Sequence, residues 1–225
     1  YSFVITETAG GETWYEYDGS EWTLTVTVED HESVLEVTDV VYAKDGAVQE
    51  EAQAASFTNS YHASGTLTLD NFSKTLTGSP LAEGQFTFTL TDADGNVLQT
   101  VTNGADGSIA FEPLTYDETD IGQTYTYTVS ETNGNATGIT YDETVYTVNV
   151  TVADSANSDG TLAVTTEILN GDQAVEGEGD ALPEIAFENT FSGSVTLTKQ
   201  GEDGRLLAGA EFTLYARGEG DTYEV

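Results

Sequence analysis

The sequence has no cysteine and very few basic residues. Without cysteine no disulfide can form; an extracellular protein then needs another means of stabilisation, and a protein in a reducing compartment needs none. Only 5 of the 225 residues are basic, against 40 acidic ones, and the formal net charge is −35. Such a surface repels nucleic acids and anionic membranes, so we expect neither as a partner. A halophilic protein would show the same balance, and that interpretation stays open.

Long hydrophobic runs and helical patterns are missing too. No stretch approaches the length of a transmembrane helix, and no signal peptide precedes Tyr1, so we expect no membrane insertion in this part. Threonine and valine are abundant, proline occurs three times, and 12 tyrosines and 9 phenylalanines are available for a core. This composition predicts an all-β protein. Because its repeating pattern is cut at both ends, we interpret the sequence as a fragment of a longer protein.

The sequence repeats itself imperfectly. Residues 1–10 match residues 125–134 at an offset of 124, whereas residues 57–61 match residues 187–191 at an offset of 130. We place the extra residues in the acidic, glycine-rich loop at 170–181, where insertions are tolerated. Three polar residues recur in this way: Glu7 as Glu131, Asp18 as Asp142, and Asn59 as Asn189.

The repeat predicts three parts of the chain. Residues 1–61 form the C-terminal half of a β-sandwich, residues 62–191 form a complete one, and residues 192–225 form the first strands of a third. No flexible linker separates them, so we expect a stiff rod. Turn residues, such as Asp94-Gly95-Asn96, separate the strands of the complete sandwich at a spacing near ten. The predicted strands are 65–70, 72–77, 84–91, 97–102, 107–112, 123–131, 144–153, 161–169 and 184–191.

Polar residues interrupt the apolar face of three predicted strands. Lys74 shares a face with Phe72 and Leu76, because side chains two positions apart point the same way in a strand. Glu131 ends one apolar series in the same phase, and Asn189 interrupts another. Burying such groups is costly unless they contact one another. The pattern therefore predicts that the three side chains meet inside the core.

A lysine, a glutamate and an asparagine in an apolar pocket can form a covalent cross-link. Such a pocket favours the neutral forms of an amine and of a carboxyl group. We expect Lys74 to attack the carboxamide of Asn189, while a protonated Glu131 donates a hydrogen bond to the carboxamide oxygen and shuttles protons. Ammonia leaves and an amide bond remains, with no cofactor. The first and last strands of many sandwiches are neighbours, which would bring the two residues together.

A buried salt bridge beside a hydrogen-bonded asparagine is the simpler interpretation of the same pattern. Recurrence favours the cross-link. Glu7 and Asn59 keep the same phase in the first part, whose lysine is missing here, and Lys199 keeps it in the third part. We expect these three residues to stay unlinked. The inward-facing parity switches at Asp70-Asn71, which predicts a bulge or a short break there.

These motifs carry a family resemblance. The segment from Lys74 to Phe88 and the strands that hold Glu131 and Asn189 resemble the streptococcal-type pilin isopeptide-linkage domain. The resemblance covers residues 65–191 in full and 1–61 in part. Residues 193–216 are similar to the opening of a collagen-adhesin B-type (Cna B-type) domain. These resemblances imply tandem immunoglobulin-like (Cna B-type) β-sandwiches, the first and last truncated. They imply a Lys74–Asn189 bond with Glu131 as the catalytic residue, and partial sites at Glu7, Asn59 and Lys199.

The resemblance also implies a function. We expect a structural stalk segment of a Gram-positive pilin or adhesin, located at the cell surface and anchored to the cell wall. Its partners would be neighbouring domains or pilin subunits. A module that binds a host glycan or protein through exposed loops is the alternative. An enzyme with turnover has the least support, because the cross-link consumes its own residues in a single reaction.

Three further features point to nothing more than ordinary structure. Residues 92–96 have the rhythm of a calcium loop, but Asn103 stands where the bidentate glutamate belongs, so we expect a hairpin turn and no metal. His31 and His62 are isolated in the sequence, which supports neither a metal site nor a catalytic dyad. Lys44 is interpreted as a solvated hairpin lysine, with a sortase acceptor as the alternative.

Overall fold

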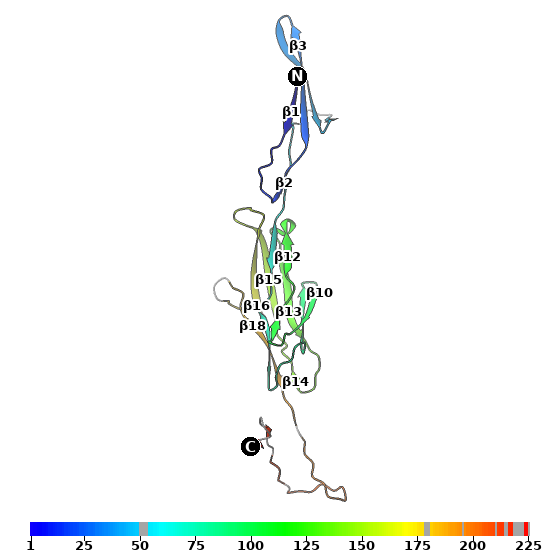
Figure 1. Ribbon diagram of the computed structural model, residues 1–225, viewed down its shortest axis with the longest axis vertical. Coiled ribbons are helices and arrows are strands. Elements are labelled where there is room, and N and C mark those ends of the chain that lie inside the picture. The colour runs from blue at the N-terminus through cyan, green and yellow to red at the C-terminus, as the bar shows by residue number, and fades with distance from the viewer. Residues whose placement is uncertain are drawn as a thin grey trace.

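The structure is a computed structural model that describes residues 1–49, 54–177, 181–194, 196–209, 211–213, 216–217 and 223–224. The regular structure in these residues is β-strand, apart from one 3₁₀ turn, η1 (Glu118–Asp120). The all-β class predicted from the sequence is therefore confirmed. Figure 1 shows an elongated arrangement, with an N-terminal sheet at one end, a central sandwich, and a C-terminal segment beyond it.

The central sandwich consists mainly of two sheets. The larger is antiparallel, with the order β10-β9-β13-β15-β16-β17, and the smaller has the order β11-β8-β18-β14. A separate antiparallel pair joins β7 to β12. The bounds are β7 (Ser64–Leu67), β8 (Phe72–Thr77), β9 (Thr87–Asp92), β10 (Val97–Thr102), β11 (Ser108–Ile109), β12 (Leu114–Asp117), β13 (Thr124–Thr132), β14 (Ile139–Thr140), β15 (Val145–Asp154), β16 (Leu162–Asn170), β17 (Gln173–Ala174) and β18 (Ile185–Phe191).

The core of the central sandwich lies between its sheets and is rich in aromatic rings. Phe187 of β18 is fully buried and packs against the rings of Phe88 and Tyr146, with a centroid distance of 5.3 Å to each. Phe72 of β8 stacks on it at 6.1 Å. Val129 of β13 is fully buried as well. The alternation of apolar and polar residues seen in the sequence thus corresponds to inward and outward faces.

An early strand and the last strand of the sandwich are neighbours, as expected. β8 and β18 pair in parallel, with Lys74 opposite Phe187. The predicted break before β8 is also present, because residues 68–71 connect two strands that belong to different sheets. Asn71 anchors this break to the start of β18, since its side-chain amide donates a hydrogen bond to the Pro183 carbonyl (2.7 Å). The backbone N–H of Ile185 bonds to the Asn71 carbonyl (2.9 Å).

The N-terminal sheet reproduces half of the central sandwich. Phe3 stands opposite Leu24, just as Tyr127 stands opposite Val148 in β13 and β15. Phe3 is 53% exposed, whereas Tyr127 is 8% exposed, so the same sequence position faces solvent in one copy and the core in the other. The order is β1-β3-β4-β5, and β2 pairs with β6. The bounds are β1 (Ser2–Thr6), β2 (Tyr15–Glu16), β3 (Glu21–His31), β4 (Val34–Lys44), β5 (Ala47–Val48) and β6 (Ser60–Tyr61).

The extra residues of the central repeat are not all where the sequence placed them. Trp22 pairs with Lys44 in the N-terminal sheet, and Tyr146 pairs with Asn170 at the matching position of the central one. The offset between the copies is therefore already 126 at Asn170, before the acidic loop. Part of the insertion lies in the connection between β15 and β16. The equivalent connection in the N-terminal sheet, between β3 and β4, is a tight turn. Both connections are exposed hairpins, where length varies freely.

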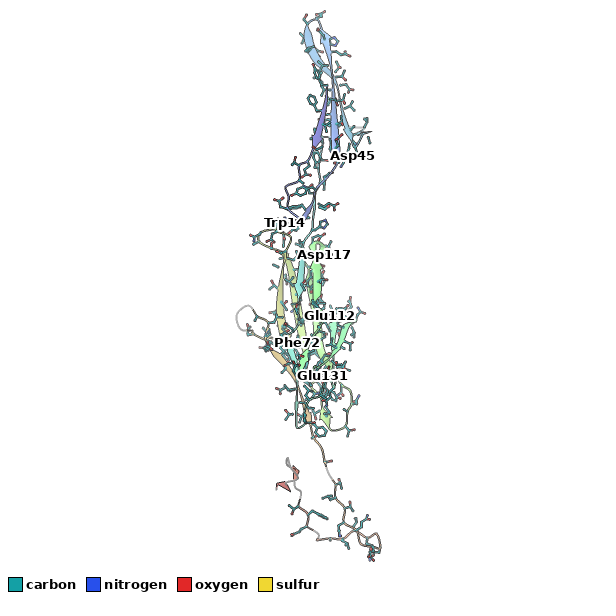
Figure 2. All side chains as sticks on the ribbon, in the orientation of Figure 1. Trp14, Asp45, Phe72, Glu112, Asp117 and Glu131 are labelled. Carbon is teal, nitrogen blue, oxygen red and sulfur yellow. The ribbon has the colours of Figure 1, made fainter. Side chains whose placement is uncertain are left out.

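Hydrogen bonds join the N-terminal sheet to the central sandwich. The Tyr61 hydroxyl donates to Asp154 (2.7 Å) and accepts from the Gly160 N–H (3.2 Å). The His62 N–H bonds to the Trp14 carbonyl (2.8 Å). Gly160 has a φ of +77°, and an added Cβ would lie 2.6 Å from Trp14, so glycine suits this contact on both counts. Figure 2 shows Trp14 at the end of the sandwich that faces the N-terminal sheet.

The C-terminal segment has little regular structure in its described residues. Residues 196–199, where the sequence predicts a strand with an inward lysine, form no strand, and Leu197 is 60% exposed. A turn at 201–205 is closed by the hydrogen bond from the Gly201 N–H to the Arg205 carbonyl (2.9 Å). Two short strands pair beyond it, β19 (Ala216–Arg217) and β20 (Tyr223–Glu224). Residue 195 lies outside the described residues.

Candidate cross-linking site

Three strands of the central sandwich bring Lys74, Glu131 and Asn189 together. Lys74 lies on β8 and Asn189 on β18, and these strands are parallel neighbours in the smaller sheet. Glu131 comes from β13 in the larger sheet, where it stands opposite Phe88 of β9. In Figure 2, Glu131 lies in the half of the sandwich that is remote from Trp14. The site therefore bridges the two sheets across the core.

One carboxylate contacts both nitrogen atoms of the proposed reaction. The Lys74 Nζ donates to Oε2 of Glu131 at 2.7 Å. The Asn189 Nδ2 donates to Oε1 of the same carboxylate at 2.6 Å. Glu131 thus holds the amine and the carboxamide on its two oxygens. This arrangement suits a group that carries a proton from one nitrogen to the other.

The site is sealed from solvent. The side chains of Lys74 and Glu131 have no exposed surface, and Asn189 is 1% exposed. The Lys74 Nζ lies 4.8 Å from the ring centroid of Phe86 and 6.0 Å from that of Phe88. Burial lowers the pKa of Lys74, although the hydrogen bond and the charge of Glu131 act in the opposite direction. The environment therefore makes the lysine easier to deprotonate than it is in water.

The carboxamide oxygen of Asn189 has a different partner from the one expected. The sequence predicts a hydrogen bond to this oxygen from protonated Glu131. In the structure Glu131 instead accepts from the carboxamide nitrogen, and Oδ1 accepts from the backbone N–H of Asp142 at 2.7 Å. The expected donor is therefore wrong: a carboxylate that already accepts from Lys74 is better matched to the nitrogen end of the amide.

Asp142 is the residue at this site that sequence reasoning missed. Its side chain accepts hydrogen bonds from two backbone N–H groups, those of Glu188 (2.8 Å) and Thr144 (2.9 Å). Burial alone would raise the pKa of Asp142, but the hydrogen bonds from Thr144 and Glu188 outweigh it, so the pKa is lowered. The available signal was the recurrence of Asp18 as Asp142, which sequence analysis left without a role.

A second copy of this arrangement exists in the N-terminal sheet. The Asn59 Nδ2 donates to Oε1 of Glu7 at 2.7 Å, and Asn59 Oδ1 accepts from the Asp18 N–H at 2.8 Å. Oε2 of Glu7, which matches the oxygen that contacts Lys74, is buried and has no hydrogen-bond partner among the described residues. Lys199 is exposed in the C-terminal segment. The structure therefore brings Glu7 and Asn59 together, without Lys199.

The remaining sequence candidates have ordinary surroundings. Asp92 accepts hydrogen bonds from the backbone N–H groups of Asp94 (3.0 Å) and Asn96 (2.8 Å), which fits the predicted hairpin turn between β9 and β10. Lys44 ends β4 at a hairpin, as predicted, and lies 3.6 Å from Asp18. Among the described residues, no group of three potential ligands is arranged to hold a metal ion.

The two histidines differ in their surroundings. His31 is exposed near Glu29 (3.5 Å). His62 is not isolated in space, because it lies 3.0 Å from Glu118 of the sandwich and 3.7 Å from Glu16 of the N-terminal sheet. In the described part of the chain, no helix has the length and apolar composition required to cross a bilayer.

Comparison with known proteins assigns the family. The FctA family model, described as Spy0128-like isopeptide containing domain, matches residues 1–62 and 71–192. No curated protein matches the chain. Two similar solved structures come from Streptococcus pyogenes. The major pilin protein T-13 has 22% identity over 58% of this chain and 53% of that one, with a TM-score of 0.32. A mutant of the major pilin has 21% identity over 57% and 50%, with a TM-score of 0.34.

The chain thus spans about half the length of these two pilins. Similarity at this level carries no information about function. The family model, in contrast, covers far more than half of the chain, in two stretches that include Glu7 and Asn59 in the first and Lys74, Glu131 and Asn189 in the second. The chain therefore belongs to the FctA family of Spy0128-like isopeptide containing domains.

Proposed function

We propose that this chain is a structural stalk segment of a Gram-positive surface pilin or adhesin, stiffened by an amide bond between Lys74 and Asn189. The observation that carries the proposal is the contact of Glu131 with both reacting nitrogens inside a sealed core. The family description supports the cross-link. The resemblance of the motifs to pilin domains supports a place at the cell surface, with neighbouring domains or pilin subunits as partners.

The reaction needs only these side chains. Transfer of the shared proton from Lys74 to Glu131 leaves a neutral amine, which is the nucleophile. Nζ attacks Cγ of Asn189, and negative charge develops on Oδ1. Glu131 then relays one proton from Nζ to Nδ2, the Cγ–Nδ2 bond breaks, and ammonia leaves. An amine and a carboxamide become a secondary amide and ammonia, so atoms and charges balance. Each chain reacts once, without turnover.

Energetics favour the cross-link over a permanent salt bridge. Removing an ammonium and a carboxylate from water costs several kcal/mol for each ion, and their attraction repays this cost only with excellent geometry. The amide product has no charge on the former lysine nitrogen, so it removes the need to bury an ion pair. A core that encloses Lys74 and Glu131 completely is therefore better suited to the linked state.

The exposed apolar residues of the N-terminal sheet can be explained without a host ligand. Tyr1, Phe3 and Ile5 are exposed there, but the positions that match Phe3 and Ile5 in the central sandwich are the buried Tyr127 and Val129. The repeat therefore accounts for their apolar character as that of core positions. We favour the stalk over a ligand-binding module for this reason.

The first prediction concerns the intact mass. Mass spectrometry of the denatured protein should give a mass one ammonia below the sequence mass. Glu131→Gln should restore the full mass, because its amide cannot take the proton from Lys74. The matched control is Glu7→Gln, which changes the equivalent residue of the N-terminal copy and should leave the ammonia loss intact. A wild-type protein at full sequence mass would reject the proposed function.

The second prediction concerns which residues are joined. Protease digestion followed by tandem mass spectrometry should yield one branched peptide, in which Lys74 is joined to Asn189. Asn59 and Lys199 should appear only in linear peptides, because the Glu7 oxygen that would hold an amine has no hydrogen-bond partner among the described residues, and Lys199 is exposed in the C-terminal segment. A branched peptide that contains Asn59 or Lys199 would show that our assignment of the partial sites is wrong.

A further inference from the structure

We infer that Asp142 supplies an oxyanion site for the cross-linking reaction, with its backbone N–H as the hydrogen-bond donor and its side chain as the clamp that aims this donor. The inference rests on the proposed cross-link and adds a residue to it. Neither the family description nor the three-residue site of Lys74, Glu131 and Asn189 includes this role.

The N–H of Asp142 points at the atom on which charge develops. Attack of the amine on Cγ of Asn189 turns the carboxamide oxygen Oδ1 into an oxyanion. The Asp142 N–H lies 2.7 Å from that oxygen before reaction. A preorganised donor in a water-excluded site stabilises such a charge far more strongly than it does in water. Because the donor is already in place, no reorganisation is needed as the charge forms.

The side chain of Asp142 fixes this donor in position. One carboxylate oxygen accepts from the N–H of Glu188, the residue directly before Asn189 on β18. The other accepts from the N–H of Thr144, two residues further along the same loop. The carboxylate therefore ties the loop after β14 to the strand that presents the carboxamide. The short pairing of β14 with β18 holds the other end of this loop.

The same arrangement occurs independently in the N-terminal copy. The N–H of Asp18 donates to Oδ1 of Asn59 at 2.8 Å. The Asp18 carboxylate accepts from the N–H of Thr58 (3.0 Å), directly before Asn59, and from the N–H of Ser20 (2.9 Å). All three contacts match those of Asp142. These contacts recur although the neighbouring Glu7 holds no lysine among the described residues, so the Asp carboxylate and the asparagine are arranged together without the amine.

The two carboxylates divide the chemistry between them. Glu131 contacts the two nitrogens and moves protons. Asp142 contacts no nitrogen of the reaction; its N–H faces the oxygen and its carboxylate is occupied by backbone donors. Substitution of Glu131 should therefore abolish the reaction, whereas loss of the Asp142 donor should slow it and leave its end point unchanged.

The decisive test removes only the donor. The full chain is made by cell-free synthesis with the α-hydroxy analogue of aspartate at position 142, which keeps the carboxylate and replaces the backbone N–H by an ester oxygen. Samples are quenched in acid and denaturant at successive times after a short synthesis pulse, and the linked fraction is read from the intact mass. We expect linkage to slow by about 100-fold and still to reach completion, the size found when one oxyanion donor is removed.

A second variant tests the clamp. Asp142→Ala should also slow linkage, because the donor is then no longer aimed by Glu188 and Thr144. Asp92→Ala is the matched control, since Asp92 also accepts two backbone N–H bonds, in a hairpin turn away from the site. It should leave the rate unchanged. The refolding time course of each variant is followed by circular dichroism, and folding that is complete well before linkage establishes that slow linkage is not slow folding.

The possible outcomes separate the two proposals. A wild-type protein that never loses ammonia overturns the cross-link and, with it, the role of Asp142. A wild-type protein that links while the ester analogue links at the same rate overturns the role of Asp142 alone. A folded ester analogue that links slowly to completion supports both.

Discussion

A single molecule of this chain, pulled by its two ends, should extend without ever releasing the residues between 74 and 189. If Lys74 and Asn189 are joined, the tension passes from β8 to β18 through a covalent bond, and the more than one hundred residues between them carry no load. The Glu131→Gln protein should lack this bond. It should show one additional unfolding event that lengthens the molecule by about 400 Å, the contour length of the released segment.

The pairing of β8 and β18 makes this difference easy to measure. The two strands are parallel, and the chain enters β8 at Phe72 and leaves β18 at Phe191. The two pulling forces therefore act at opposite ends of the strand pair and load its hydrogen bonds in shear. The N-terminal sheet provides an internal reference. Its residues have no cross-link in either protein and should release about 200 Å in both recordings. Full extension of the wild-type protein, including the segment from 74 to 189, would contradict the bond.

The second large effect is on thermal stability. Closing a loop of more than one hundred residues constrains the unfolded chain by about 5 kcal/mol, by analogy with a disulfide. For a domain of this size that corresponds to a melting temperature roughly 15–25 °C lower in a variant without the bond. Calorimetry or circular dichroism on heating measures this directly. A reducing agent should not change the result for the wild-type protein, because an amide bond is not reduced.

The variant for this measurement must remove the bond without leaving a buried charge. Glu131→Gln alone leaves the Lys74 amine without its counter-ion, and breaking a buried ion pair in this way costs about 3–5 kcal/mol by itself. Adding Lys74→Met removes both charges, and such a replacement is often neutral. The double variant therefore isolates the contribution of the cross-link. A melting temperature within a few degrees of the wild-type value would argue against a stabilising bond.

Alternation along the strands predicted the positions that matter most. β8 has the predicted bounds, 72–77; β13 is shifted by one residue at both ends, and β18 begins one residue later than predicted. Because the period of a strand is two, the inward phase of Lys74, Glu131 and Asn189 followed from the apolar residues beside them. The break before β8 was predictable for the same reason, since the apolar phase shifts by one residue there.

Short elements were not predictable in this way. β12 (Leu114–Asp117) and β14 (Ile139–Thr140) were missed because two to four residues are too few to display alternation. β14 matters for the site, since it starts the loop that carries Asp142. The extra residues of the β15–β16 connection were also assigned to the wrong loop, because matching two sequences shows only that an insertion lies somewhere between two matching positions.

The role of Asp142 was hidden for a chemical reason. Its contact with Asn189 uses the backbone N–H, which every residue except proline possesses. The residue type at position 142 therefore does not indicate this contact. The two ends of the Asn189 carboxamide also look alike in a sequence, and only the positions of Glu131 and Asp142 decide which end faces which. Recurrence of Asp18 as Asp142 was the single trace of this function in the sequence.

The absence of exposed surface on Lys74 and Glu131 has a consequence for the lifetime of the product. Hydrolysis would require a water molecule beside the new amide, and the reverse reaction would require ammonia to return to the same place. The rings of Phe86 and Phe88 lie beside the Lys74 nitrogen and leave an apolar environment in which water is disfavoured, and ammonia lost to bulk solvent would be too dilute to reverse the reaction. The proposed bond, once formed, should therefore persist while the sandwich stays folded, and it should itself oppose the unfolding that would expose it. If Lys74 and Asn189 are joined, the folded core is thus what keeps solvent from their amide.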